Sequence, residues 1–164
     1  MLCSTTALPL ALAALLAAAA PQPQASAGKA PEDRALERAL KLLRPPPTVP
    51  VRFIDPELAA DPQAIRQVDA FLVREAGGGL RPVIYLNLRS PIVVNAVRGR
   101  EIDIAILAAV VRHEQEHLRG GSENQARVAE REFFQRLIFA GRVPLEEGLA
   151  YLHDLARNRR LREG

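Results

Sequence analysis

Apolar residues recur at the three-to-four-residue spacing of a helix face in three separate parts of the chain. A proline or glycine bounds each of these parts, and helices commonly begin or end at such residues. The first predicted helix begins at Pro31 and buries Leu36, Leu40 and Leu43. The second runs from Asp61-Pro62 to Gly77-Gly78-Gly79 and buries Ile65, Val68 and Leu72. The third lies beyond Gly141 and Pro144 and buries Leu145, Leu149, Leu152 and Leu155.

Two shorter segments have the pattern of strands. Residues 51–54 are rich in β-prone side chains, and residues 83–88 alternate, with Ile84, Leu86 and Leu88 on one face and Val83, Tyr85 and Asn87 on the other. Four prolines between residues 45 and 50 indicate an extended linker before the first strand. We therefore predict a predominantly helical α+β protein, with a short helix and linker over residues 28–50 and one domain over residues 51–164.

The segment from residue 101 to residue 118 predicts a buried central helix. It contains no Gly or Pro, and residues 102–111 are apolar on nearly every side except at Asp103. At about 100° per residue, the stripe that begins at Ile102 continues into His113 and His117. The segment between these histidines reads His-Glu-Gln-Glu-His, an HExxH motif.

This spacing is typical of a zinc site. Two imidazoles one helical turn apart project from the same face and can bind one Zn²⁺. Glu114 lies beside them on the helix, where a carboxylate can accept a proton from water at the metal. A plain surface helix is the alternative, in which Glu116 pairs with Arg112 four residues earlier.

A third ligand is expected just after the motif. Gly120-Gly121 ends the helix, and Ser122 with Gln125 forms a capping box that begins the next one. Glu123 follows His117 by six residues, and Glu130 lies two turns further along the same face. We expect Glu123 to bind the metal and Glu130 to orient a histidine, although the two roles could be exchanged. Ordinary pairing of Glu123 with Arg127 is the alternative.

Residues 113–123, HEQEHLRGGSE, fit the pattern HExxHxxGxxE. With the strand and the apolar helix before them, they resemble zincin-type metallopeptidases, specifically short gluzincin-like bacterial proteins, over about residues 80–140. The resemblance implies that His113, His117 and Glu123 bind zinc and that Glu114 is the general base. It also implies that residues 83–87 form an edge strand for extended peptide, with Tyr85 and Asn87 toward the cleft, and that Tyr151 or His153 stabilises an oxyanion.

The first 27 residues contain no Lys, Arg, Asp or Glu, and residues 7–20 are an unbroken run of Ala, Leu and one Pro. This pattern predicts a signal peptide over residues 1–27, cleaved after Ala25-Ser26-Ala27, and hence a periplasmic or secreted protein without further membrane insertion. An uncleaved N-terminal anchor is the alternative. Cleavage would remove Cys3, the only cysteine, which excludes disulfides and thiolate ligands from the mature chain.

The formal net charge is +3, and basic and acidic residues are interspersed, so a nucleic-acid-binding stripe is not expected. The sequence favours a zinc-dependent hydrolase, a metallopeptidase that acts on peptides or proteins. A second hypothesis is a non-catalytic envelope protein whose helices bind a partner and whose metal site is structural or vestigial. The sequence does not indicate an oligomeric state.

Overall fold

The computed structural model describes residues 29–75 and 79–162. The helices are α1 (Pro31–Leu42), α2 (Pro62–Arg66), α3 (Pro91–Val97), α4 (Glu101–Leu118), α5 (Glu123–Phe139) and α6 (Leu145–Arg162), with a 3₁₀ turn, η1 (Pro56–Leu58). The strands are β1 (Val51–Ile54), β2 (Ala70–Arg74) and β3 (Leu80–Asn87). The predicted class, a predominantly helical α+β fold, is confirmed.

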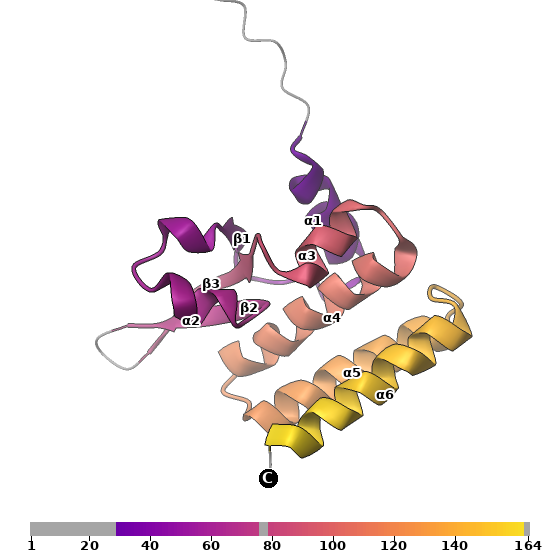
Figure 1. Cartoon of the computed structure of the whole chain (residues 1–164). Coiled ribbons are helices and arrows are strands. Elements are labelled where there is room, and N and C mark those ends of the chain that lie inside the picture. The colour runs from indigo at the N-terminus through magenta and orange to yellow at the C-terminus, as the bar shows by residue number, and fades with distance from the viewer. Residues whose placement is uncertain (1–28, 76–78, 163–164) are drawn as a thin grey trace, which may run out of the picture.

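Helix α4 is the centre of the molecule, and its bounds are those predicted from the sequence. Helices α1 and α3 pack on one side of it, and the antiparallel pair α5 and α6 lies on another (Figure 1). Alanines are interspersed with larger apolar residues along α4, and Ala105, Ala108 and Ala109 are at most 1% exposed. Small side chains on several faces let the neighbouring helices approach closely, as a central helix requires. Within the described part of the chain, no helix is long and apolar enough to cross a membrane.

The sheet has three strands in the order β1-β3-β2, with β1 parallel and β2 antiparallel to β3. The strand predicted over residues 83–88 is therefore present, but its expected position at an edge is wrong. Ile84 and Leu86 are fully buried, and their strand has a hydrogen-bonded neighbour on each side. Asn87 is also buried, and its amide donates to the carbonyl groups of Ile65 and Val68. These contacts give Asn87 a structural role.

The helix predicted from Asp61 to residue 76 is also wrong beyond its first turns. Helix α2 begins as predicted, with the Asp61 side chain accepting from the backbone N–H of Ala64, but it ends at Arg66. The chain then forms β2, whose residues pair with β3 in the register Phe71–Tyr85 and Leu72–Ile84. Pairing with the next strand of the chain therefore overrides a local helical spacing. The stacked rings of Phe71 and Tyr85, with centroids 5.4 Å apart, favour the paired state.

Helix α6 is present, and its predicted leucine stripe is buried only in part. Leu152 packs against the core and Leu155 is half-buried, but Leu145 and Leu149 are 63% and 54% exposed. Gly148 and Tyr151 also face α5: a Cβ on Gly148 would lie only 2.6 Å from Cγ1 of Ile138, and the Tyr151 ring packs on Phe134. A glycine lets two helices approach closely, and a hydrophobicity pattern does not count it as a core position. Helix α3 had not been predicted, although Ser90 caps it and Pro91 opens it.

Candidate metal centre

The turn between α4 and α5 brings the HExxH motif against the start of α5. The backbone N–H of Gly120 donates to the carbonyl of His117, and that of Gly121 donates to the carbonyl of Glu116. These two bonds form a Schellman motif, which needs the left-handed backbone seen at Gly120, where φ is +87°. The predicted capping box of Ser122 and Gln125 is present and starts α5 immediately afterwards.

Gly121 is needed for a different reason. A Cβ at this position would lie 2.8 Å from Cγ and 2.9 Å from the carbonyl oxygen of Glu116, so only a glycine fits beside the last turn of α4. Its own carbonyl oxygen lies 3.0 Å from Nδ1 of His117. The turn therefore reverses the chain and at the same time holds one of the two motif histidines.

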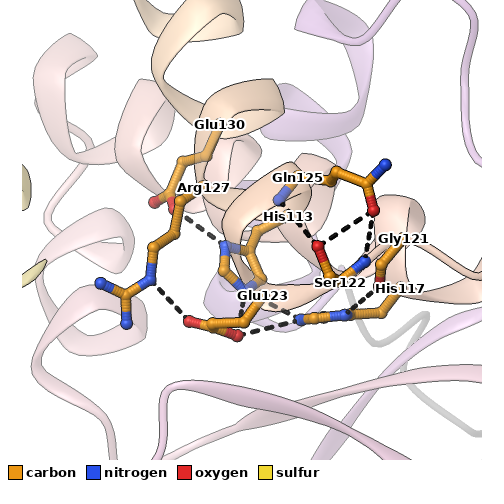
Figure 2. A network of polar contacts seen from close by, with 8 residues as sticks. All are labelled: His113, His117, Gly121, Ser122, Glu123, Gln125, Arg127 and Glu130. Carbon is orange, nitrogen blue, oxygen red and sulfur yellow. Dashed lines mark hydrogen bonds and ion pairs between the residues drawn. The ribbon is translucent and has the colours of Figure 1, made fainter. Parts of the chain in front are cut away.

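Three side-chain atoms converge in this corner: Nε2 of His113, Nε2 of His117 and Oε2 of Glu123 (Figure 2). The two Nε2 atoms are 3.2 Å apart, and the Glu123 oxygen is 3.2 Å from His117 and 3.5 Å from His113. Ligands at about 2.0–2.1 Å from a tetrahedral zinc are about 3.3–3.4 Å from one another. The spacing of the three atoms therefore fits three corners of a zinc coordination tetrahedron.

The outer nitrogens of both imidazoles are occupied, which determines how the rings face the cluster. Nδ1 of His117 donates to the Gly121 carbonyl, which can only accept, and Nδ1 of His113 lies 3.0 Å from Oε2 of Glu130. In the neutral rings, with the proton on Nδ1, both Nε2 atoms carry lone pairs that point toward Oε2 of Glu123. Three acceptors that meet in this way attract a cation. Without a metal that cation is a proton on an imidazole: burial lowers the pKa of His113, but the neighbouring carboxylates, Glu130 first, raise it by more. Hydrogen-bond partners on the outer ring nitrogens are typical of zinc-binding histidines.

Glu123 has contacts on both of its oxygens. Oε1 accepts from Nε of Arg127 at 2.7 Å, while Oε2 faces the imidazoles. Pairing with Arg127, which the sequence offered as an alternative to ligation, is therefore compatible with it. Partial burial raises the pKa of the Glu123 carboxyl. The hydrogen bond from Arg127 and the positive charge of Arg127 and of protonated imidazoles lower it by more, so the net shift is downward. The carboxylate is thus kept ionised, as a ligand must be.

Glu130 lies on the outer side of His113. Its carboxylate is 5% exposed and accepts from the Tyr151 hydroxyl at 2.7 Å as well as from Nδ1 of His113. It does not face the two Nε2 atoms. The geometry therefore favours Glu123 as the third ligand and Glu130 as the residue that orients His113, the arrangement expected from the sequence.

Glu114 lies on the wall of the same cavity as both histidines and Glu123. It is 8% exposed, and burial raises the pKa of its carboxyl, although charge on the neighbouring histidines acts in the opposite direction. A carboxyl group whose pKa lies above its ordinary value is better suited to accept and release a proton near neutral pH. The position and the raised pKa of Glu114 are those that an acid–base group beside the cluster would need.

The cavity has a volume of about 730 Å³ and lies between the α4–α5 turn and strand β2. Its apolar wall includes Phe71 and Leu72 of β2 and Leu155 of α6, and its polar wall includes Arg127. Neither Tyr85 nor Asn87 lines it, so the strand facing the candidate site is β2 and not the one predicted.

The two residues suggested as oxyanion stabilisers do not line the cavity. Tyr151 donates to Glu130 behind His113, and His153 is exposed with Asp154 as its neighbour at 3.8 Å. Sequence reasoning missed the contributions of the Gly121 carbonyl and of Tyr151 to this site. The spacing of four residues did predict that Arg127 pairs with Glu123. It predicted this pairing as an alternative to metal binding, whereas in the structure Arg127 holds one oxygen of Glu123 while the other faces the histidines.

Comparison of the chain with protein-family models, with curated proteins and with solved structures gives no match. The assignment of a function therefore depends on the motif and on the geometry of the corner formed by α4 and α5.

Proposed function

We propose that the protein is a zinc-dependent hydrolase, a zincin-like metallopeptidase that acts on peptides or proteins. One observation carries the proposal: three acceptor atoms converge at the spacing of zinc ligands, with the carboxyl group of Glu114 on the wall of the same cavity. A structural zinc site has four protein ligands, whereas a catalytic site has three and keeps one position open. A set of three ligands beside a cavity has the second composition.

His113, His117 and Glu123 would hold the metal. Bound zinc supplies Lewis acidity, which polarises a carbonyl group and makes water more acidic. Glu114 takes a proton from water as the water oxygen attacks the carbonyl carbon of the peptide bond. It then delivers that proton to the leaving nitrogen as the C–N bond breaks, so that the products are an amine and a carboxylic acid, which ionises at neutral pH. Arg127 keeps Glu123 in its ionised form throughout.

Strand β2 is the part of the protein best placed to bind an extended substrate. It lies at an edge of the sheet and lines the cavity with Ala70, Phe71 and Leu72. An extended peptide can pair with a strand edge through main-chain hydrogen bonds, which are independent of its sequence. The apolar wall favours uncharged side chains next to the bond that is cleaved.

The substitution Glu114→Gln tests the proposal. The amide has the size of the carboxyl group but cannot take the proton, so zinc content should be retained while the rate of peptide hydrolysis falls by about 10²–10⁴-fold. Glu116→Gln is the matched control, because Glu116 is two residues further along the same helix and pairs with Arg112 and Arg119. Zinc content and cleavage of a mixed peptide library should be measured for all three proteins.

If the rate of peptide hydrolysis falls by less than tenfold in Glu114→Gln, Glu114 is not the general base. A native protein that contains one zinc per chain but cleaves none of the peptides would contradict the enzymatic proposal. That result would favour a non-catalytic protein with a structural metal site.

A further inference from the structure

Tyr151 connects the C-terminal helix to the candidate metal centre. Its hydroxyl donates to Oε1 of Glu130 at 2.7 Å, and Oε2 of the same carboxylate lies 3.0 Å from Nδ1 of His113. Two hydrogen bonds in series therefore link a residue of α6 to a ligand side chain of α4 through a residue of α5. Neither the HExxH chemistry nor the substrate cavity needs this tyrosine.

The position of the Tyr151 ring is determined by packing. Its centroid is 4.3 Å from that of Phe134, which is fully buried, and the two rings are tilted by 46°. One turn earlier, Gly148 allows α6 to approach so closely that a Cβ there would overlap Ile138. The hydroxyl thus reaches Glu130 only because α6 is docked tightly on α5.

Glu130 depends on these two contacts. It is 5% exposed, and within the described ranges its side chain makes hydrogen bonds with His113 and Tyr151. A buried carboxylate that loses one donor is left with an unsatisfied oxygen, which is costly and favours rotation of the group. Burial and the Glu130 carboxylate raise the pKa of the Tyr151 phenol well above its ordinary value, so the hydroxyl stays protonated and acts as the donor.

We propose that Tyr151 is a positioning residue of the metal centre: it fixes Glu130, which fixes the ring of His113, so that docking of α6 and metal affinity are coupled. This inference rests on the proposed metal site but not on hydrolysis. Coupling of this kind is reciprocal. Removal of the hydroxyl weakens metal binding, and metal binding in turn stabilises the docked α6.

The test compares Tyr151→Phe with Tyr85→Phe, which removes the same group from the only other tyrosine of the chain. Tyr85 stacks on Phe71 in the sheet and does not line the metal cavity. Zinc affinity is measured by competition with a chromophoric chelator. Substitution of residues that orient zinc-binding histidines typically costs about 10–100-fold in affinity. Tyr151 acts one step further out, so a loss of about tenfold is expected for Tyr151→Phe and none for Tyr85→Phe.

Three further measurements separate positioning from a general loss of stability. The visible spectrum of the Co²⁺-loaded protein should change in Tyr151→Phe, because the orientation of the His113 ring changes, and should be unchanged in Tyr85→Phe. Zinc should slow amide hydrogen exchange in α6 around residues 148–155 of the native protein, and it should do so much less in Tyr151→Phe. Loss of the hydroxyl should also cost no additional zinc affinity once Glu130→Ala has removed the intermediate residue.

The proposal is overturned if Tyr151→Phe binds zinc within twofold of the native protein with an unchanged Co²⁺ spectrum. These outcomes are distinct from those that concern hydrolysis. Zinc binding that depends on Tyr151 in a protein that cleaves no peptide would support this inference and contradict the proposed function. Peptidase activity with zinc affinity insensitive to Tyr151 would do the reverse, and a native chain that binds no zinc would contradict both.

Discussion

Two glutamates at the same corner of the molecule have carboxyl groups with opposite environments. Arg127 and the imidazoles lower the pKa of Glu123, whereas burial raises the pKa of Glu114. A ligand must be ionised, and a general base must be able to hold a proton, so each environment suits the role assigned to its residue. The surroundings of each side chain, and not the residue type, divide the roles.

The raised pKa of Glu114 has a consequence for stability. For a carboxyl group whose pKa is higher in the folded than in the unfolded chain, the ionised form destabilises the fold. Without metal, the native protein should therefore lose stability relative to Glu114→Gln as the pH rises from about the ordinary value of 4.5 to the folded pKa, and the difference should then stay level. Urea unfolding with a chelator between pH 4 and pH 8 measures this difference.

Glu116→Gln is again the control, because Glu116 is held by exposed and half-buried arginines. Glu116→Gln retains the buried Glu114, so it should lose stability with rising pH as the native protein does. A difference between the native protein and Glu114→Gln that is independent of pH would show that Glu114 is not buried in a way that affects its ionisation.

At the scale of elements, the α4–α5 turn determines where the ligands lie. Replacement of Gly121 by Ala places a Cβ 2.9 Å from a backbone oxygen that cannot move without distorting α4. The turn must then shift, and with it the carbonyl that holds His117. We expect Gly121→Ala to lower zinc affinity by about tenfold, as loss of an outer partner does. Isothermal titration with zinc measures the change.

Gly99→Ala is the matched control for this variant. Gly99 has a φ of +85° at the turn between α3 and α4, at the other end of α4 from the site, so the alanine is strained but its Cβ only touches the end of the Arg38 side chain at 3.4 Å. It should destabilise the fold by about 1–2 kcal/mol and leave zinc affinity unchanged. Equal zinc affinities in Gly121→Ala and the native protein would mean that the Gly121 carbonyl does not orient His117.

The site could be predicted from sequence where several local signals coincide. The apolar segment, the two glycines and the Ser122 cap all lie within about twenty residues, and together they define α4, the turn and the start of α5. Periodicity could not separate Glu123 from Glu130, because both lie on one face of α5. The offset between the two helices decides, and it depends on the close fit of Gly121 against Glu116.

The errors concern contacts between one element and another, which the periodicity of a single segment does not contain. A helical spacing over residues 65–72 predicted a helix, but β2 is stabilised by pairing with β3, which a local pattern does not contain. A leucine stripe predicted the buried face of α6, but only its second half is partly buried, and the close approach at Gly148 places Tyr151 against α5 as well. The connection from Tyr151 to His113 was invisible for the same reason, since it joins three helices.

At the scale of the whole molecule, the candidate site lies where the helical part meets the sheet. Helices α4 and α5, which lie side by side in Figure 1, would provide the ligands, and strand β2 forms the opposite wall of the cavity. Helix α6 packs on α5, and its Tyr151 donates to Glu130. Zinc would join the end of α4 to the start of α5, and the hydrogen bonds through Glu130 and Tyr151 link that corner to α6. Because zinc would bind only the folded chain, its binding should stabilise the fold.

The predicted signal peptide, residues 1–27, also leads to a testable prediction. Residues 1–27 lie outside the described residues, so export is argued from the charge-free segment and from Ala25-Ser26-Ala27 alone. The protein recovered from the periplasm or the culture medium should have Gly28 as its N-terminal residue by Edman sequencing. An intact chain recovered only from the cytoplasm would contradict export, and an intact chain in the membrane would indicate an anchor.

Binding of zinc by His113, His117 and Glu123 together can be seen in a crystal structure of the zinc-loaded protein, with anomalous data on both sides of the zinc absorption edge. We predict one anomalous peak per chain, at about 2.0–2.1 Å from Nε2 of each histidine and about 2.0–2.2 Å from Oε2 of Glu123. The absence of a peak between the two histidines would contradict the account, and a peak bound by Glu130 with Glu123 turned toward Arg127 would contradict the assignment of the third ligand.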